Sequence, residues 1–263
     1  MVRADEGVWL YAVTREVPAP WLADLTGVDG EQIRVVVSTG LMAIVGTVDL
    51  ADFGEQVLPA RLEDIDVLAA LARDHDGVIE AAVHRVTTAP MRLATMYFDD
   101  ARVGQMLKDH HDDLDRTLRL IDGCEEWGVK GFAPTVTTPA QREPETSASR
   151  DAPGGGAAYL RRRRNQLMAR DESENMAYRR AELVHDSLVR LSKLERRHPP
   201  QDPKLTGVDT AMVLNGAYLV PRERAATFAE TVAVLGRQAG GLRLELTGPW
   251  PAYSFTGLRE TTT

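Results

Sequence analysis

Apolar and polar positions in the first part of the chain follow the pattern of short strands. Residues 8–13, 33–38 and 41–48 are rich in β-branched side chains, which strands favour. Thr39-Gly40 separates the second run from the third. A glycine-containing pair of residues between two such runs predicts a hairpin.

The pattern then changes to the three- and four-residue spacing of amphipathic helices. Residues 63–86 carry one such stripe, and residues 91–98 follow as a predicted strand. Asp99 and Asp100 are natural N-caps for the next helix, which we expect to end at Gly123. Its apolar stripe consists of Val103, Met106, Leu107, Leu114, Leu118 and Ile121. A further strand is expected over residues 125–132.

Composition changes sharply after this strand. Residues 134–156 are rich in Pro, Gly, Ser and Thr and bury little apolar area, so we expect a mobile connector. A long charged helix should follow over residues 159–196. Its C-terminal half carries apolar residues at near-heptad spacing: Ala177, Ala181, Val184, Leu188, Leu191 and Leu194. The chain closes with a strand at 211–220, a helix at 222–238 and a strand at 242–247.

These elements predict an α+β protein of two domains. Residues 1–123 should form an N-terminal α/β domain. The closing strand, helix and strand are half of a ferredoxin-like sandwich, and the strand at 125–132 with the long helix can supply the other half. Residues 124–263 should therefore form a C-terminal ferredoxin-like domain that includes the mobile loop 134–156 and the long helix 159–196.

Charge and cysteine content narrow the function classes. The chain has 263 residues, with 39 acidic against 31 basic side chains and a formal charge of -8, which disfavours nucleic acid as a partner. A single cysteine, Cys124, suits a reducing compartment. No apolar run approaches the roughly 20 residues that cross a bilayer, so we expect a cytoplasmic protein without a membrane partner.

Candidate catalytic and metal-binding residues are sparse. His110 and Asp113 could share one helix face and bind a metal, although solvation of an outer face is the simpler interpretation. Glu125 and Glu126 follow Cys124 and would raise its pKa, which favours a structural thiol. Lys130-Gly131-Phe132-Ala133 begins like an RNA-recognition signature, but Pro134 interrupts it. We expect no enzyme activity, no cofactor and no metal.

Candidate partner contacts are basic or aromatic. Arg161, Arg162, Arg163 and Arg164 form a run at the start of the long helix, and Trp250 and Tyr253 lie in an aromatic closing segment. The arginines could dock an acidic partner or form a solvated helix end, and the aromatics could bind a protein or close the core.

Several segments together resemble one family, the gas vesicle accessory proteins GvpF and GvpL. In chain order they are Trp9-Leu10-Tyr11-Ala12, PMRLATMYF at 90–98, EWGVK at 126–130, GAAYL at 156–160 with Arg163-Arg164 after it, PPQDP at 199–203, NGAYLV at 215–220 and ELTGPWPAYSF at 245–255. Each segment alone is a weak indication of the family. Together, and in this order, the segments span nearly the whole chain. Ala94 stands where the family strand often has glycine. Of the two proteins, we favour GvpF.

The resemblance implies a non-enzymatic role in the cytoplasm during gas vesicle formation. It implies binding to the hydrophobic shell subunit GvpA and to other Gvp proteins, which would prevent aggregation or aid nucleation, with retention as a minor vesicle component as a further option. Two alternatives stay open. One is a ferredoxin-like enzyme or small-molecule-binding protein that uses an inter-domain cleft, with His84, Arg92 and Tyr97 as its residues. The other is self-association through the long helix.

Overall fold

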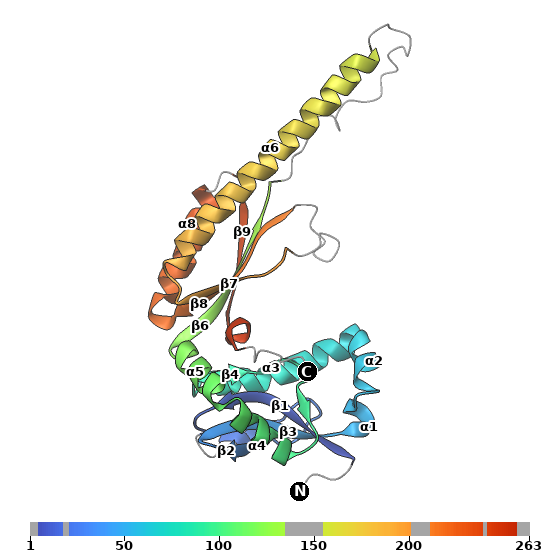
Figure 1. The fold of residues 1–263 in the computed structure, drawn as a ribbon, viewed down its shortest axis with the longest axis vertical. Coiled ribbons are helices and arrows are strands. Elements are labelled where there is room, and N and C mark those ends of the chain that lie inside the picture. Colours follow the sequence, from blue (N-terminus) through green and yellow to red (C-terminus); the bar gives the residue numbers. More distant parts are fainter. Residues whose placement is uncertain (1–4, 18–20, 135–154, 201–210, 239–240, 257–263) are drawn as a thin grey trace. The chain divides into compact units, whose positions relative to one another are not determined.

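The protein is a mixed helix-and-sheet molecule with two separate sheets (Figure 1). The computed structural model describes residues 5–17, 21–134, 155–200, 211–238 and 241–256. The chain divides into two compact units. Unit 1 comprises residues 1–126 and 249–263, and unit 2 comprises residues 127–248.

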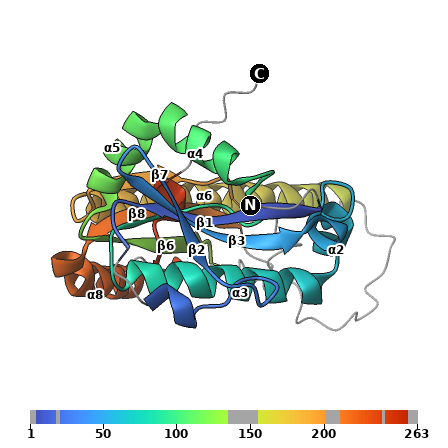
Figure 2. The ribbon, with the colours of Figure 1, turned by 90° about the horizontal axis from the view of Figure 1, so that it is seen from below.

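Unit 1 is built on a five-stranded sheet of order β2-β3-β1-β4, with β5 also paired to β1. Its strands are β1 (Glu6–Thr14), β2 (Arg34–Ser38), β3 (Leu41–Asp49), β4 (Thr88–Pro90) and β5 (Met96–Tyr97). Its helices are η1 (Trp21–Asp24), α1 (Leu50–Phe53), α2 (Leu58–Glu63), α3 (Ile65–Val83), α4 (Asp100–Asp109) and α5 (His111–Ile121). Figure 2 shows α3 on one side of the sheet and α4 with α5 on the other. Both faces of β1 are therefore covered, and its residues from Gly7 onward are all buried.

The expected hairpin is confirmed. β2 pairs antiparallel with β3, from Arg34 opposite Val45 to Ser38 opposite Leu41. Thr39 and Gly40 both have positive φ, 52° and 79°, as a two-residue turn of matching twist requires.

The expected single strand over residues 91–98 was wrong. β4 pairs with β1 at Ala12–Thr14, whereas β5 pairs at Val8 and Trp9. The Met91 N–H donates to the Tyr11 carbonyl at 2.8 Å, and the Leu10 N–H donates to the Thr95 carbonyl at 2.9 Å, so neighbouring residues of β1 bond to residues four positions apart. Residues 92–95 turn away from the sheet instead, with Ala94 at φ 65°.

The expected helix after Asp99 is present but divided. The Asp99 carboxylate accepts the Arg102 N–H at 2.8 Å, which confirms the cap. All six residues of the predicted stripe are buried. The chain breaks at His110, whose φ and ψ of -109° and 16° lie outside the helical range, and α5 restarts at His111.

Unit 2 has a four-stranded sheet of order β7-β8-β6-β9. Its strands are β6 (Cys124–Phe132), β7 (Leu194–Arg197), β8 (Met212–Pro221) and β9 (Arg243–Trp250), and its helices are α6 (Gly155–Val189), η3 (Arg222–Arg224) and α8 (Ala225–Gln238). Figure 1 shows α6 and α8 side by side on one face of this sheet. The core joins both helices to β8 through Ala177, Ala181, Val184, Leu188, Tyr218, Val220, Phe228 and Val232.

The long helix ends earlier than expected. α6 stops at Val189, and the residues predicted as its last turns include the strand β7. β7 pairs antiparallel with β8, from Leu194 opposite Leu219 to Arg197 opposite Gly216. Pairing with a strand that is distant in sequence thus overrides the local helical pattern.

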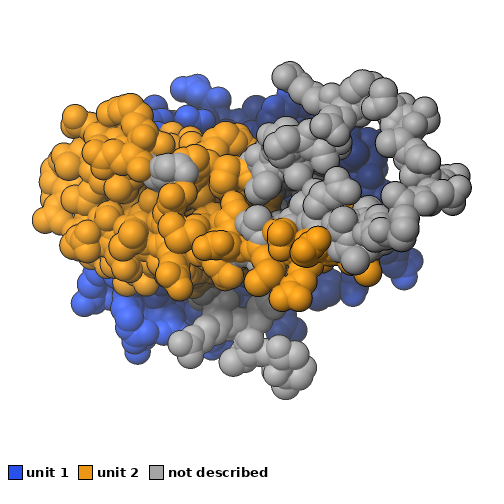
Figure 3. Space-filling view, turned by 90° about the horizontal axis from the view of Figure 1, so that it is seen from above, with its two compact units in different colours: residues 1–126, 249–263 blue, residues 127–248 orange. Residues whose placement is uncertain are grey.

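Figure 3 colours the two units separately. The strands β6 and β9 each run across a boundary between them. Unit 2 begins at Trp127, close to the boundary expected after Gly123. The C-terminal segment from Pro249 belongs to unit 1 in this division, whereas the sequence placed it in the second domain. The predicted mobile connector falls almost entirely on residues 135–154, outside the described residues.

Candidate functional site

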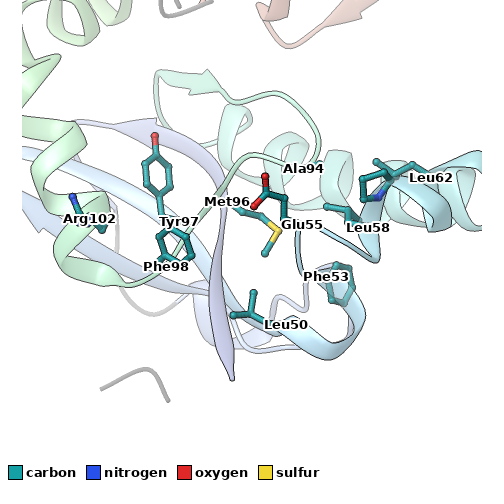
Figure 4. Close-up of a pocket in the computed structure, with 11 residues that line it drawn as sticks. Leu50, Phe53, Glu55, Leu58, Leu62, Ala94, Met96, Tyr97, Phe98 and Arg102 are labelled. Atoms are coloured by element: carbon teal, nitrogen blue, oxygen red, sulfur yellow. The ribbon is translucent and has the colours of Figure 1, made fainter. Parts of the chain in front are cut away.

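Unit 1 contains an apolar pocket of about 830 Å³ (Figure 4). It is lined by α1, α2 and the segment that joins them, and by the turn before β5, β5 itself and the start of α4. The lining residues are Leu50, Phe53, Glu55, Leu58, Pro59, Leu62, Ala94, Met96, Tyr97, Phe98 and Arg102. Glu55 and Arg102 are the charged members of this set, so the pocket suits a ligand with a largely apolar surface.

Aromatic packing holds one wall of the pocket in place. Phe53, which is 1% exposed, meets the buried Trp9 of β1 edge to face, with ring centroids 5.7 Å apart. The Arg61 guanidinium lies over the Phe53 ring, 4.7 Å from its centroid. Phe53 is therefore held between the core of the unit and the surface of α2.

The opposite wall depends on a close approach at Gly7 of β1. A Cβ there would lie 2.9 Å from Leu50 Cδ2 and 3.1 Å from Met96 Cε. Glycine therefore lets a side chain from α1 and one from β5 pack together over the strand. Any larger residue at this position would push both lining residues into the pocket.

The turn that carries Ala94 is strained. Ala94 has φ 65°, and the left-handed region costs a non-glycine residue about 1–2 kcal/mol. Thr95 holds the turn, because its Oγ1 donates to the Arg92 carbonyl at 2.7 Å. Strain of this kind is often found where a loop shapes a binding site.

Ala94→Val should lower the free energy of unfolding by about 2 kcal/mol, because a β-branched residue fits this conformation worse than alanine. Ala94→Gly should leave stability equal or higher. Ala60→Val, the same change on the exposed surface of α2, should cost well under about 1 kcal/mol. Urea unfolding compares the three variants, and equal losses for the two valine variants would contradict the assignment of strain.

A buried histidine connects the pocket wall to α3. The Trp9 indole N–H donates to His75 Nδ1 at 2.9 Å. His75 Nε2 must then carry the proton and donate to the Met91 carbonyl oxygen, 3.1 Å away. The imidazole also stacks on Tyr11 with centroids 5.2 Å apart and is 1% exposed. One neutral side chain thus joins β1, α3 and the start of the strained turn.

Stability should fall as the pH drops below the ordinary imidazole value of about 6.5. Burial lowers the pKa of His75, outweighing the Met91 carbonyl and Asp76, which favour the charged form. The unfolded chain therefore binds this proton at a higher pH than the folded chain. Acid consequently lowers the free energy of unfolding. His185 of α6, whose pKa burial also lowers, acts in the same direction. The free energy of unfolding from urea titrations between neutral pH and pH ~5 should decline by at most about 1.4 kcal/mol per pH unit for each histidine. A flat profile would contradict both assignments.

The pocket's chemistry favours binding rather than catalysis. Burial raises the pKa of Tyr97, so its hydroxyl stays protonated at neutral pH. His84 is exposed at the end of α3 near Glu80, and Arg92 is exposed in the strained turn; neither lines the pocket. Of the three residues considered for an enzyme, the pocket thus contains Tyr97 alone.

The predicted metal pair is not held on one helix. His110 lies in the break between α4 and α5, while Asp113 binds Arg116 at 2.7 Å. Across the described residues, no three His, Cys, Asp or Glu side chains gather as a metal site would require. Cys124 is buried at the start of β6, with Sγ 3.5 Å from the Asp122 carbonyl oxygen.

The predicted arginines lie on α6, which the structure extends well beyond the sheet of unit 2 (Figure 1). Arg161, Arg163 and Arg164 are exposed, and Arg162 belongs to the same helix. None of them lines the pocket.

The two predicted aromatics differ in environment. Trp250 is 55% exposed. Tyr253 packs against the core of unit 1, and its hydroxyl donates to Asp76 at 2.6 Å. Ser254 donates twice to the Glu126 carboxylate, and the Thr256 hydroxyl donates to the Pro90 carbonyl at 2.9 Å. Tyr253 thus attaches the closing segment to unit 1, which leaves Trp250 as the more accessible contact.

Sequence reasoning missed the pocket because its residues are typical core residues. Leu58, Leu62 and Met96 resemble any other buried position in the sequence. Phe98 is the exception: it directly precedes the Asp99 cap and is 77% exposed. An aromatic residue next to a helix cap, outside the buried stripe of that helix, is the signal that could have indicated the site.

The class of protein follows from comparison with known families. The family described as "Gas vesicle synthesis protein GvpL/GvpF" matches residues 7–257. This chain belongs to that family and so has a role in gas vesicle formation. None of the described helices is both long enough and apolar enough to cross a membrane.

Two similar proteins are named as L-type gas vesicle proteins. The chain is 41% identical to Gas vesicle protein L of Streptomyces sp. (strain CB03234) over 256 residues, which covers 97% of this chain and 95% of that protein. It is 22% identical to Gas vesicle protein L1 of Halobacterium salinarum over 264 residues, 95% of this chain and 90% of that one. These names do not support our preference for GvpF over GvpL.

Two crystal structures share the fold. GvpF from Anabaena sp. PCC7120 aligns with a TM-score of 0.65 at 20% identity, covering 96% of this chain and 97% of that one. GvpF from Microcystis aeruginosa aligns with a TM-score of 0.63 at 19% identity, covering 96% and 99%. The mixed helix-and-sheet architecture is therefore that of solved members of the family.

Proposed function

We propose that this protein binds the hydrophobic shell subunit GvpA and that the apolar pocket of unit 1 receives an apolar segment of it. The observation that carries the proposal is the pocket itself: about 830 Å³, lined mainly by aliphatic and aromatic side chains, among them the exposed Phe98. A volume of this size accommodates several apolar side chains of a partner at once.

The structure of a gas vesicle explains why an apolar binding pocket would be needed. A shell that keeps liquid water out of a gas space requires a strongly apolar inner face. Before assembly that face is an aggregation hazard. A binder that covers part of it lowers the exposed apolar area until the subunit is delivered to the growing shell.

Phe98 is the expected anchor. It is 77% exposed although it is a large aromatic side chain, and burying such a side chain is worth about 1.5–3 kcal/mol. Val57, Ile65 and Leu68, which lie close in sequence to the lining residues Leu58 and Leu62, are also exposed. Exposed apolar residues grouped beside a pocket are typical of a protein interface.

The absence of enzymatic activity, the location, the further partners and the domain organisation are also proposals. We infer a non-enzymatic protein of the cytoplasm that also binds other Gvp proteins, with Trp250 as a second contact. Unit 2 has the element order βαββαβ, which supports a ferredoxin-like domain. The domain boundary after Gly123 is proposed with it, with the closing segment from Pro249 assigned to the first domain.

Co-purification tests the central part of the proposal. The chain, expressed with GvpA, should retain the subunit in solution, and a strain lacking this chain should form few or no gas vesicles. If GvpA is not retained and the deletion strain forms normal vesicles, the proposal is wrong. Mass spectrometry of the purified chain detects a bound small molecule, which would favour the ligand-binding alternative.

A further inference from the structure

The wall of the pocket formed by residues 49–66 has an acidic rim. Residues 49–66, which supply much of the lining, contain six carboxylates and one arginine. All six carboxylate residues, Asp49, Asp52, Glu55, Glu63, Asp64 and Asp66, are exposed. Arg61 lies close to Asp52, at 3.8 Å. This wall therefore favours a segment that is both apolar and basic, whereas Arg102 of α4 is the basic residue of the lining.

The chain itself contains a segment of that kind in the first half of α6. Residues 160–170 contain five arginines and no acidic residue. Leu160, Leu167 and Met168 are 67%, 51% and 59% exposed. Among the described side chains of α6, the first that is buried is Ala177. About 33 Å of helix, at 1.5 Å per residue, thus precedes the part that packs on its own sheet.

The spacing of these residues matches recognition of a helix by a groove. Leu160, Leu167 and Met168 stand at positions i, i+7 and i+8, which places them along one side of the helix. Arg161 and Arg164 lie one turn apart beside them. One side of α6 therefore presents aliphatic side chains together with positive charges, and Arg164 lies between Leu160 and Leu167 on that side.

We propose that the first half of α6 from one copy of this chain docks in the acidic, apolar pocket of unit 1 of a second copy. The aliphatic residues of α6 enter the pocket beside Phe98. Arg161 and Arg164 face the carboxylates of Glu55 and Glu63 on the rim. This contact does not depend on the shell subunit, and it would keep the pocket covered until a stronger apolar ligand displaces the helix.

The contact joins two different surfaces, so it is heterologous. Such contacts form closed rings or growing chains, according to geometry. Because the attraction is largely between exposed charges, salt should weaken it strongly. We expect the dissociation constant for self-association to rise at least about tenfold between low and high salt.

Sedimentation of the purified full chain over a wide concentration range tests the proposal without the shell subunit. Arg161→Glu with Arg164→Glu should abolish association, and Glu55→Lys with Glu63→Lys should do the same. Mixing the two variants should restore pairing, because the natural α6 of the pocket variant meets the natural pocket of the α6 variant, and the two reversed surfaces also carry opposite charges. Arg224→Glu with Arg237→Glu, an equal charge change on exposed residues near the two ends of α8, is the matched control and should associate like the natural sequence.

The results separate this proposal from the proposed function. A chain that is monomeric at every concentration, or a self-association that survives both charge reversals, overturns the proposal whatever is found with GvpA. Failure of the mixed variants to associate also overturns it. Binding of GvpA by the charge-reversed α6 variant, measured separately, should persist because the pocket is unchanged.

Discussion

Replacing Leu62 and Phe98 together by glutamate should weaken binding of the shell subunit about 100-fold, since each removes an apolar contact worth about 1–2 kcal/mol at the pocket. Both side chains are at least partly exposed, and Phe98 is 77% exposed. The folded state should therefore tolerate the change. Retention of GvpA from cells that express both proteins, followed by titration with solubilised subunit, measures the loss.

A matched variant controls for the added charge. Val37→Glu with Leu183→Glu also replaces two exposed apolar residues, 63% and 67% exposed, neither of which lines the pocket. This control should bind the subunit normally. Equal losses for the two double variants would show that apolar exposure in general, and not the pocket, determines binding.

His75→Phe should lower the free energy of unfolding by about 3 kcal/mol, the second large effect. Phenylalanine keeps a ring of similar size but leaves the Trp9 indole N–H and the Met91 carbonyl without their buried partner. Each unsatisfied buried group costs about 1–3 kcal/mol. Urea unfolding at neutral pH measures the change.

Two further variants isolate the hydrogen bonds. His84→Phe, at the exposed end of the same helix, should change stability by less than about 0.5 kcal/mol. Trp9→Phe combined with His75→Phe should cost less than the sum of the single changes, because both remove the same bond. Additive losses would mean that the Trp9–His75 bond contributes nothing.

Local signals predicted much of the fold. The Thr39-Gly40 turn lies between two β-branched runs, and the Asp99 cap precedes an apolar stripe, so the sequence itself contains the information. β7 shows the limit of such signals. Leu194–Arg197 is short, charged and exposed, and it becomes a strand through pairing with β8.

The turn over residues 92–95 has a similar cause. It lies between the separate pairings of β4 and β5 with β1, and no pattern within 91–98 encodes those contacts with a strand distant in sequence. The pocket combines this turn with residues 50–62, which are distant in sequence. Of the partner contacts proposed from sequence, Arg161, Arg163 and Arg164 are exposed, whereas Tyr253 holds the closing segment to unit 1.

A photo-crosslinking amino acid placed at Phe98 tests most directly whether the pocket binds the shell subunit. The same crosslinker at Val37, exposed on β2 and outside the pocket lining, is the reference. With GvpA co-expressed, we predict a crosslinked product from position 98, mapped by mass spectrometry to an apolar segment of the subunit, and none from position 37. Equal crosslinking at both positions, or none at position 98 while GvpA is still retained, would contradict the account.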